Sequence, residues 1–237
     1  MTYEQVLEQL QSLADPQAVA GMARFGITPA QTYGASLPQL RSLARRIGRD
    51  HDLALHLWEA DVRETRILAT IVADPKLVTE DLMEQWAKDF DYWEICDQCC
   101  MNLFERIELA YAKALEWSAR NEEFVKRAGF VLMARLAVSD KKAADSRFEA
   151  FFPPILREAG DERNYVKKAV NWALRQIGKR NLALCSQAIA VAEQMRSMDS
   201  PSARWIATDA LRELTSEAVQ ARLRRDSMEV SKCVSLT

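Results

Sequence analysis

Apolar residues recur at helical spacing along nearly the whole chain, and this periodicity constrains the fold more than any other feature. Glycine and proline are scarce, with seven of each among 237 residues, which disfavours sandwiches and barrels because these need many tight turns. We therefore predict an all-α protein. Helices are expected over 36–48, 62–73, 78–88, 92–104, 107–118, 122–138, 143–158, 162–178, 181–197 and 201–214.

Several helix starts can be predicted from capping signals. Three dipeptides place a capping side chain directly before a proline, which suits an N-cap followed by the first helical residue. They are Asp15-Pro16, Thr28-Pro29 and Ser200-Pro201. Ser36 and Gln39 have the spacing of a capping box, which predicts a further helix start at Ser36.

Short motifs recur along the chain at the spacing of a two-helix repeat. Phe124–Ala128 recurs as Tyr165–Ala169, and Trp172–Ile177 recurs as Asp209–Leu214. Both spacings are close to the length of a HEAT or armadillo repeat, so we predict an α-α superhelix, or solenoid, with a concave face, rather than an ordinary compact bundle. One domain is expected over residues 1–225, followed by a polar C-terminal tail over 226–237.

Charge is distributed unevenly along the chain. Residues 1–119 hold 11 Lys and Arg against 19 Asp and Glu, whereas residues 120–225 hold 20 against 13. A polyanion could therefore bind the C-terminal half although the formal net charge of the whole chain is −2. Two solvated helix faces of opposite sign would give the same pattern, so charge alone does not decide the function.

No membrane or export signal is apparent in the sequence. The chain has no run of about 18 apolar residues, and its first turns carry Glu4, Glu8 and Asp15 where a signal peptide would need a basic and then an apolar segment. We expect a soluble cytoplasmic protein that has no contact with membranes.

The cysteines do not predict a metal site or a disulfide framework. Cys96, Cys99 and Cys100 are crowded together, but the chain has only two histidines, His51 and His56, and no second cysteine pair follows. We therefore expect buried reduced thiols, no metal and no cofactor.

Trp93 and Asp97 have the spacing that places two side chains on one face of a helix, one turn apart. Taken alone, this spacing favours a core tryptophan beside a surface or capping acid. A carboxylate beside a large aromatic plane becomes informative only when other residues point to the same chemistry.

A second helix combines cations with an aromatic residue. Lys168, Trp172, Arg175 and Lys179 share one face at positions i, i+4, i+7 and i+11. Lys and Arg neutralise phosphates while aromatic rings lie against sugars or bases, so these four residues, the cationic stripe, predict a nucleic-acid surface. Trp172 follows Trp93 by about two repeat lengths, which could place both on one concave wall.

Other candidates have weaker signals. Arg41 and Arg45 belong to a basic run that fits either a contact with duplex phosphates or a solvated helix face. The four remaining tryptophans are expected in the core or between helices; they are Trp58, Trp86, Trp117 and Trp205.

Four motifs in the same order resemble a known family. They are Gly34–Arg41, the Trp93 and Asp97 pair, Phe124–Ala128, and the segment Val166–Arg175 with Trp172. The chain resembles, over most of residues 20–215, the bacterial DNA alkylation repair proteins of the AlkD-like family, which are HEAT-like-repeat DNA glycosylases that release alkylated purines.

The resemblance implies an active cleft of Trp93, Asp97, Arg127 and Trp172. In this interpretation Asp97 stabilises the positive charge on the deoxyribose and positions a water, the two tryptophans hold the lesion nucleotide, and Arg127 binds a flanking phosphate. Further DNA contacts are expected from seven cations: Lys126, Lys167, Lys168, Arg175, Lys179, Arg41 and Arg45.

We therefore expect a monomeric DNA glycosylase of base excision repair. This hydrolase would cleave the N-glycosidic bond of positively charged N3- and N7-alkylated purines in double-stranded DNA. Two alternatives remain open: a non-catalytic relative that binds branched or damaged DNA, and a HEAT-type scaffold for protein interactions.

Overall fold

All regular elements in the described part of the chain are helices. The computed structural model describes the backbone of residues 1–234 and the side chains of residues 1–228. The chain forms two compact units, one over Met1–Ala110 and the other from Tyr111 onward. The expected single domain over residues 1–225 stays a prediction.

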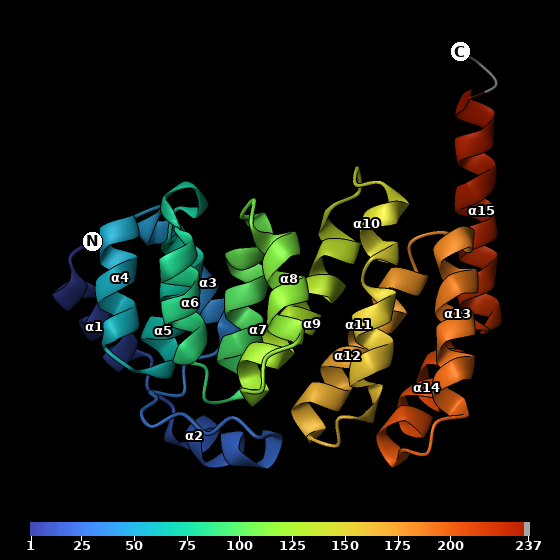
Figure 1. Cartoon of the computed structure of the whole chain (residues 1–237). Helices are drawn as coiled ribbons and strands as arrows, with labels where there is room; N and C mark the ends of the chain where they lie inside the picture. The colour runs from blue at the N-terminus through green and yellow to red at the C-terminus, as the bar shows by residue number, and fades with distance from the viewer. Residues whose placement is uncertain (235–237) are drawn as a thin grey trace. The chain divides into compact units, whose positions relative to one another are not determined.

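The first unit has two layers of helices (Figure 1). Its elements are α1 (Tyr3–Ser12), α2 (Pro16–Met22), η1 (Ala23–Phe25), α3 (Leu37–Ile47), α4 (His51–Glu59), α5 (Arg63–Val72), η2 (Pro75–Leu77), α6 (Glu80–Lys88), α7 (Trp93–Asn102) and η3 (Phe104–Arg106). Helix α5 packs against α3 and α7 in one layer and against α4 in the other. Trp58 of α4 and Trp86 of α6 are buried and stacked, with ring centroids 4.1 Å apart.

The second unit repeats this pairing of helices in two layers. Its elements are α8 (Ala110–Ser118), which begins at the boundary, α9 (Glu123–Ser139), α10 (Asp145–Glu149), α11 (Phe152–Arg157), η4 (Glu158–Gly160), α12 (Asn164–Gly178), α13 (Leu182–Arg196), α14 (Pro201–Leu214) and α15 (Glu217–Val234). Helix α12 packs between α9 and α14, while α11 and α13 cover the other side. The repeated sequence motifs therefore lie on neighbouring helices of one row.

Most capping signals are confirmed. The Asp15 side chain accepts hydrogen bonds from the first amides of α2, the Ser200 hydroxyl accepts one from the Ala203 amide, and Ser36 and Gln39 form the expected capping box. The helix start predicted at Thr28-Pro29 is wrong, because residues 26–36 form an irregular loop. Tertiary hydrogen bonds from α5, described below, hold this loop in place of local helical ones.

Two further segments differ from the expectation. In place of the single helix expected over 143–158, the chain forms two shorter helices, α10 and α11. Pro153 and Pro154 break the expected helix because proline fits only the first turn of a helix. The segment 226–237, expected to be a polar tail, continues α15 as far as Val234. Residues 235–237 lie outside the described part of the chain.

Gly129 allows α8 and α9 to approach closely. A Cβ at this position would lie 2.5 Å from the Ser118 nitrogen and 2.9 Å from the Ala114 oxygen, which are backbone atoms of α8. We expect Gly129→Ala to lower the free energy of unfolding by about 1–3 kcal/mol, measured by urea denaturation, because the helices must separate. Gly21→Ala in α2 is the matched control: a Cβ there meets nothing within 4 Å. That variant should be slightly stabilising, and equal losses in both would contradict the close approach.

Candidate functional site

The Trp93 and Asp97 pair lies at the start of α7. Trp93 is the first residue of the helix and is half-buried, and its indole Nε1 donates a hydrogen bond of 2.8 Å to the Phe25 carbonyl oxygen. Asp97 follows one turn later and is buried, with 6% of its surface exposed. The two residues thus lie one turn apart in a single helix, and the hydrogen bond to η1 fixes the orientation of the indole.

Three cysteines lie close to Asp97 in the sequence of α7. Cys96, Cys99 and Cys100 are fully buried, which confirms the burial expected from sequence, and none forms a disulfide with a described residue. Burial raises the pKa of Cys99 and Cys100 well above the ordinary value, so both stay protonated and unreactive at neutral pH. Within the described residues no group of three or more His, Cys, Asp or Glu side chains could hold a metal ion.

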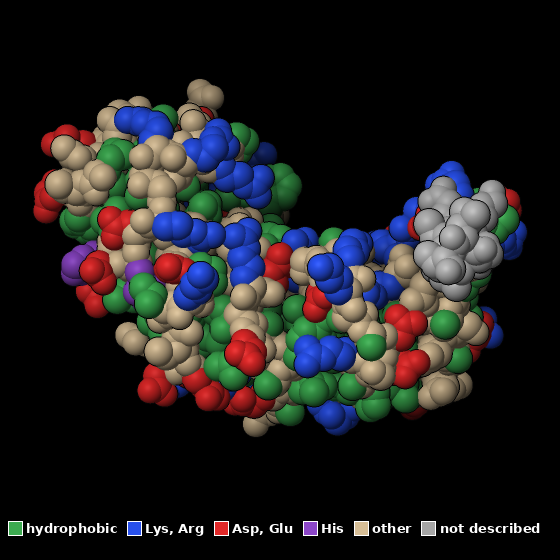
Figure 2. Space-filling view, turned by 90° about the horizontal axis from the view of Figure 1, so that it is seen from above, with side chains coloured by type: hydrophobic (Ala, Val, Ile, Leu, Met, Phe, Trp, Pro, Cys, Tyr) green, Lys and Arg blue, Asp and Glu red, His purple; other side chains and the backbone are tan. Residues whose placement is uncertain are grey.

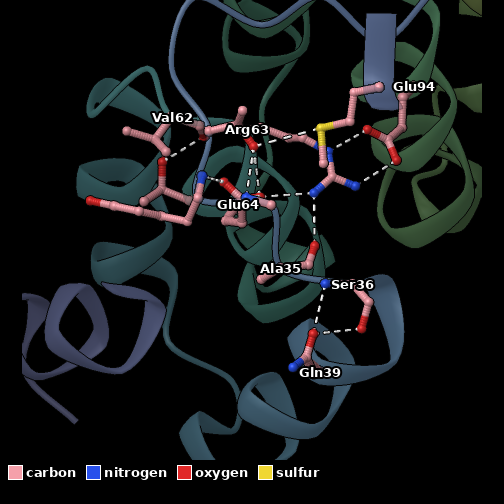
Figure 3. A network of polar contacts seen from close by, with 12 residues as sticks. Ala35, Ser36, Gln39, Val62, Arg63, Glu64 and Glu94 are labelled. Atoms are coloured by element: carbon pink, nitrogen blue, oxygen red, sulfur yellow. Dashed lines mark hydrogen bonds and ion pairs between the residues drawn. The ribbon is translucent and has the colours of Figure 1, made fainter. Parts of the chain in front are cut away.

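Arg63, Glu64 and Glu94 form a buried ion cluster, here the Arg63 cluster, between α5 and α7 (Figure 3). Arg63 donates from Nε and Nη2 to the two carboxylate oxygens of Glu94, at 2.6 and 2.8 Å. Its Nη1 donates to Glu64 and to the Ala35 carbonyl, both at 2.9 Å. Since Glu94 follows Trp93 directly, the cluster ties the first turn of α7 to α5.

Glu64 also holds the loop over residues 26–36. Its carboxylate accepts hydrogen bonds from the backbone amides of Tyr33 and Gly34 and from the Thr32 hydroxyl, at 2.9 to 3.0 Å. Gly34 has φ +87°, and a Cβ there would clash with the Asp15 carbonyl oxygen, so the loop needs glycine at this point. These contacts place the chain that follows η1. Sequence reasoning missed them because the partners lie far apart in the chain and share no motif.

Arg127 and Trp172 lie on neighbouring helices of the second unit. Arg127 of α9 is buried, and its Nη1 donates to the Tyr165 carbonyl of α12 at 2.7 Å. Trp172 of α12 is half-buried. Lys126, an expected DNA contact, is also buried and forms an ion pair with Glu158. The expected cleft draws two residues from each unit and stays a prediction.

The cationic stripe on α12 is partly neutralised by α14. Arg175 pairs with Asp209 at 2.7 Å and also with Glu213, and Lys179 pairs with Glu213 at 2.7 Å. Burial alone would raise the pKa of Asp209, but hydrogen bonds from Asn171 and Arg175 lower it below its ordinary value. Lys168 is exposed and makes no ion pair with any described residue. A role of the stripe in DNA binding stays a prediction.

Comparison with known proteins identifies the family. Residues 6–214 match the family model of the DNA alkylation repair enzyme. The chain belongs to this family. A solved structure described as "a new family of proteins related to the HEAT-like repeat DNA glycosylases with affinity for branched DNA structures" superposes with a TM-score of 0.75. It is 17% identical and covers 90% of this chain and 95% of that one, which confirms the predicted all-α HEAT-like repeat fold.

A curated relative gives no functional assignment. An uncharacterized protein of Listeria innocua is 22% identical over 134 residues, which is 55% of this chain. The alignment covers 60% of that relative, less than two thirds of its length. The membership in the DNA alkylation repair enzyme family therefore rests on the family model alone.

The other Lys and Arg side chains expected to contact DNA differ in their surroundings. Arg41 and Arg45 on α3 are exposed and form no ion pair with a described residue. Lys167 on α12 lies with its Nζ 5.0 Å from the ring centroid of Trp205. Lys and Arg side chains stand in several groups on the face seen in Figure 2, with Asp and Glu both between these groups and along the edges of the view. None of the described helices has the length and apolar content that a membrane-spanning helix needs.

Three of the four tryptophans expected in packing are buried. Trp58, Trp86 and Trp117 have at most 3% of their surface exposed, which confirms the expectation. Trp205 on α14 is 41% exposed, so it is not a core residue, but its ring lies under the Lys167 ammonium of α12 and so contacts a neighbouring helix. The buried residues of α14 around it are Ala203, Ile206 and Ala207.

Proposed function

We propose that the protein is a DNA glycosylase that hydrolyses the N-glycosidic bond of positively charged N3- and N7-alkylated purines in duplex DNA. The observation that carries the proposal is the α7 pair: a buried carboxylate, Asp97, one helical turn from Trp93, whose indole is held by the Phe25 carbonyl. Membership in the DNA alkylation repair enzyme family supports the same function.

The chemistry needs a carboxylate but no general acid. A purine alkylated at N3 or N7 carries a positive charge, so it leaves without being protonated by the protein. The deoxyribose then acquires oxocarbenium character, and a preorganised carboxylate near C1′ stabilises that charge and orients the attacking water. Because Asp97 is buried, its interaction with the developing charge would be weakly screened by solvent.

The other three residues would position the nucleotide. Trp93 and Trp172 offer aromatic faces for the sugar, with cation–π attraction to its positive charge. The hydrogen bond to Phe25 restricts the orientation of the Trp93 ring before DNA binds, which favours preorganisation. Arg127 would bind a phosphate next to the lesion.

The proposal predicts which lesions are released. We expect release of 7-methylguanine and 3-methyladenine from a methylated duplex and no release of uracil from the same sequence, because a neutral base needs an acid to leave. Single-turnover reactions with chromatographic detection of the free bases would measure both. A uracil-specific glycosylase serves as the control for the uracil duplex. Efficient uracil release by this protein would contradict the mechanism.

A second candidate function is binding of branched DNA without catalysis. One observation favours it: Arg175 and Lys179 of the cationic stripe are already paired with carboxylates of α14, which weakens their attraction for an ordinary duplex. The structural relative introduced above is described as having affinity for branched DNA. Tight binding of a four-way junction, without release of either alkylpurine, would favour this function over the glycosylase.

A further inference from the structure

A second Trp and Asp pair with the spacing of Trp93 and Asp97 lies on α14. Trp205 and Asp209 are one helical turn apart, as are Trp93 and Asp97 on α7. The repeat that aligns Asp209 with Trp172 also aligns Trp205 with Lys168. Trp205 therefore occupies, on α14, the position that begins the cationic stripe on α12.

Asp209, the acidic residue of this pair, connects two helices. Asp209 accepts hydrogen bonds from Asn171 and Arg175 of α12, both at 2.7 Å, and pairs with Arg212 on its own helix. These contacts fasten α14 to α12 one turn beyond Trp205. The carboxylate thus positions the tryptophan and is not available for the chemistry proposed for Asp97.

The aromatic member has an open surface beside a cation. Trp205 is 41% exposed, and the Lys167 ammonium lies 5.0 Å from its ring centroid. Lys167 forms no ion pair with any described residue, so its charge is not neutralised. An open aromatic ring beside an uncompensated cation is the pattern that binds unpaired nucleotides.

We propose that Trp205 and Lys167 form a nucleotide-binding site for an unpaired nucleotide of the DNA, separate from the lesion cleft. On binding, the Lys167 ammonium moves from its place over the Trp205 ring to the phosphate, and Trp205 stacks on the base. A paired base in a duplex has both faces covered by its neighbours, so the site selects a nucleotide in a single-stranded segment. The inference rests on DNA being the ligand, as in the proposed function.

Fluorescence anisotropy with labelled DNA tests this site. The two probes are a blunt duplex and the same duplex with a single-stranded overhang. We expect Trp205→Ala to weaken binding of the overhang DNA roughly fivefold or more while leaving the blunt duplex unchanged, and Trp205→Phe to retain most of the affinity. Lys167→Met should reduce the slope of log affinity against log salt by about one for the overhang DNA.

Leu182→Ala on α13 is the matched control, since it truncates an apolar side chain of similar exposure, 38%, on another helix. It should bind both probes as the wild type does, and thermal melting would show that each variant is folded. Wild-type binding by Trp205→Ala, or equal weakening for both probes, would overturn the proposal. If the wild type released no alkylpurine while Trp205→Ala still lost overhang binding, the glycosylase function would fail and this site would stand.

Discussion

Asp97→Asn is expected to lower the single-turnover rate of 7-methylguanine release by about 10²–10³, with duplex affinity changed by less than about twofold. The amide has nearly the same shape as the carboxylate, so packing in α7 is kept. It lacks the negative charge that would stabilise the oxocarbenium-like sugar. Because the cationic base leaves without being protonated and the carboxylate acts on the sugar as the bond breaks, the whole effect should appear in the rate of the chemical step. Single-turnover rates and anisotropy binding of both proteins would measure it.

Asp91→Asn provides the matched control. Asp91 lies just before α7, and its carboxylate is half exposed and 4.0 Å from Arg66. The control removes one negative charge from the same unit without touching the proposed cleft, so its excision rate should equal that of the wild type. Equal losses in the two variants would show a general effect of charge on DNA binding. An unchanged rate in Asp97→Asn would remove Asp97 from the mechanism.

Capping and repeat motifs predict a helix correctly where the contacts that stabilise it involve residues close in the chain or in the neighbouring repeat. Ser36 and Gln39 satisfy each other's backbone within one turn, so the start of α3 needs no tertiary information. The repeat of Phe124–Ala128 as Tyr165–Ala169 likewise predicts the packing of α9 on α12. Thr28-Pro29 carries an equally good local signal, yet Glu64 binds the amides of this loop from another helix. A local signal is overridden where a buried charge needs the same backbone groups.

The candidate site is predictable from sequence only in part. The spacing of Trp93 and Asp97 places both on α7, and the family resemblance supplies their roles. Sequence could not show that Arg175 is neutralised by Asp209, because ion pairs between helices depend on the contact between two faces. For the same reason the exposure of Trp205 could not be predicted: a tryptophan beside apolar residues has no local mark of exposure.

Glu94→Ala is expected to lower the free energy of unfolding of the first unit by about 3–5 kcal/mol. The substitution leaves the Arg63 guanidinium buried, with only 4% of its surface exposed, and without its bidentate partner. Burial alone would lower the pKa of Arg63, but the hydrogen bonds and charges of Glu94 and Glu64 raise it. Losing Glu94 therefore leaves a charge that is costly to bury. Urea denaturation would measure the loss.

Two further variants separate this cause from the loss of an ordinary ion pair. Glu193→Ala breaks the exposed Arg196 pair on α13 and should cost less than about 1 kcal/mol. Replacing all three members of the Arg63 cluster, as in Arg63→Met with Glu94→Leu and Glu64→Gln, should recover most of the stability, because Arg63 pairs with both carboxylates and no charge is then left unpaired. A triple variant as unstable as Glu94→Ala would contradict this explanation, and the loss would then come from packing.

The same cluster links stability to the proposed chemistry. Glu94 follows Trp93 in the chain, and Glu64 holds the loop that follows η1. Phe25 belongs to η1, and its carbonyl accepts the hydrogen bond from the Trp93 indole. Glu94→Ala should therefore increase hydrogen exchange of the amides of Tyr33 and Gly34, which Glu64 binds. If those amides stayed protected while the unit was destabilised, the cluster would act on α5 and α7 alone and would not position the tryptophan.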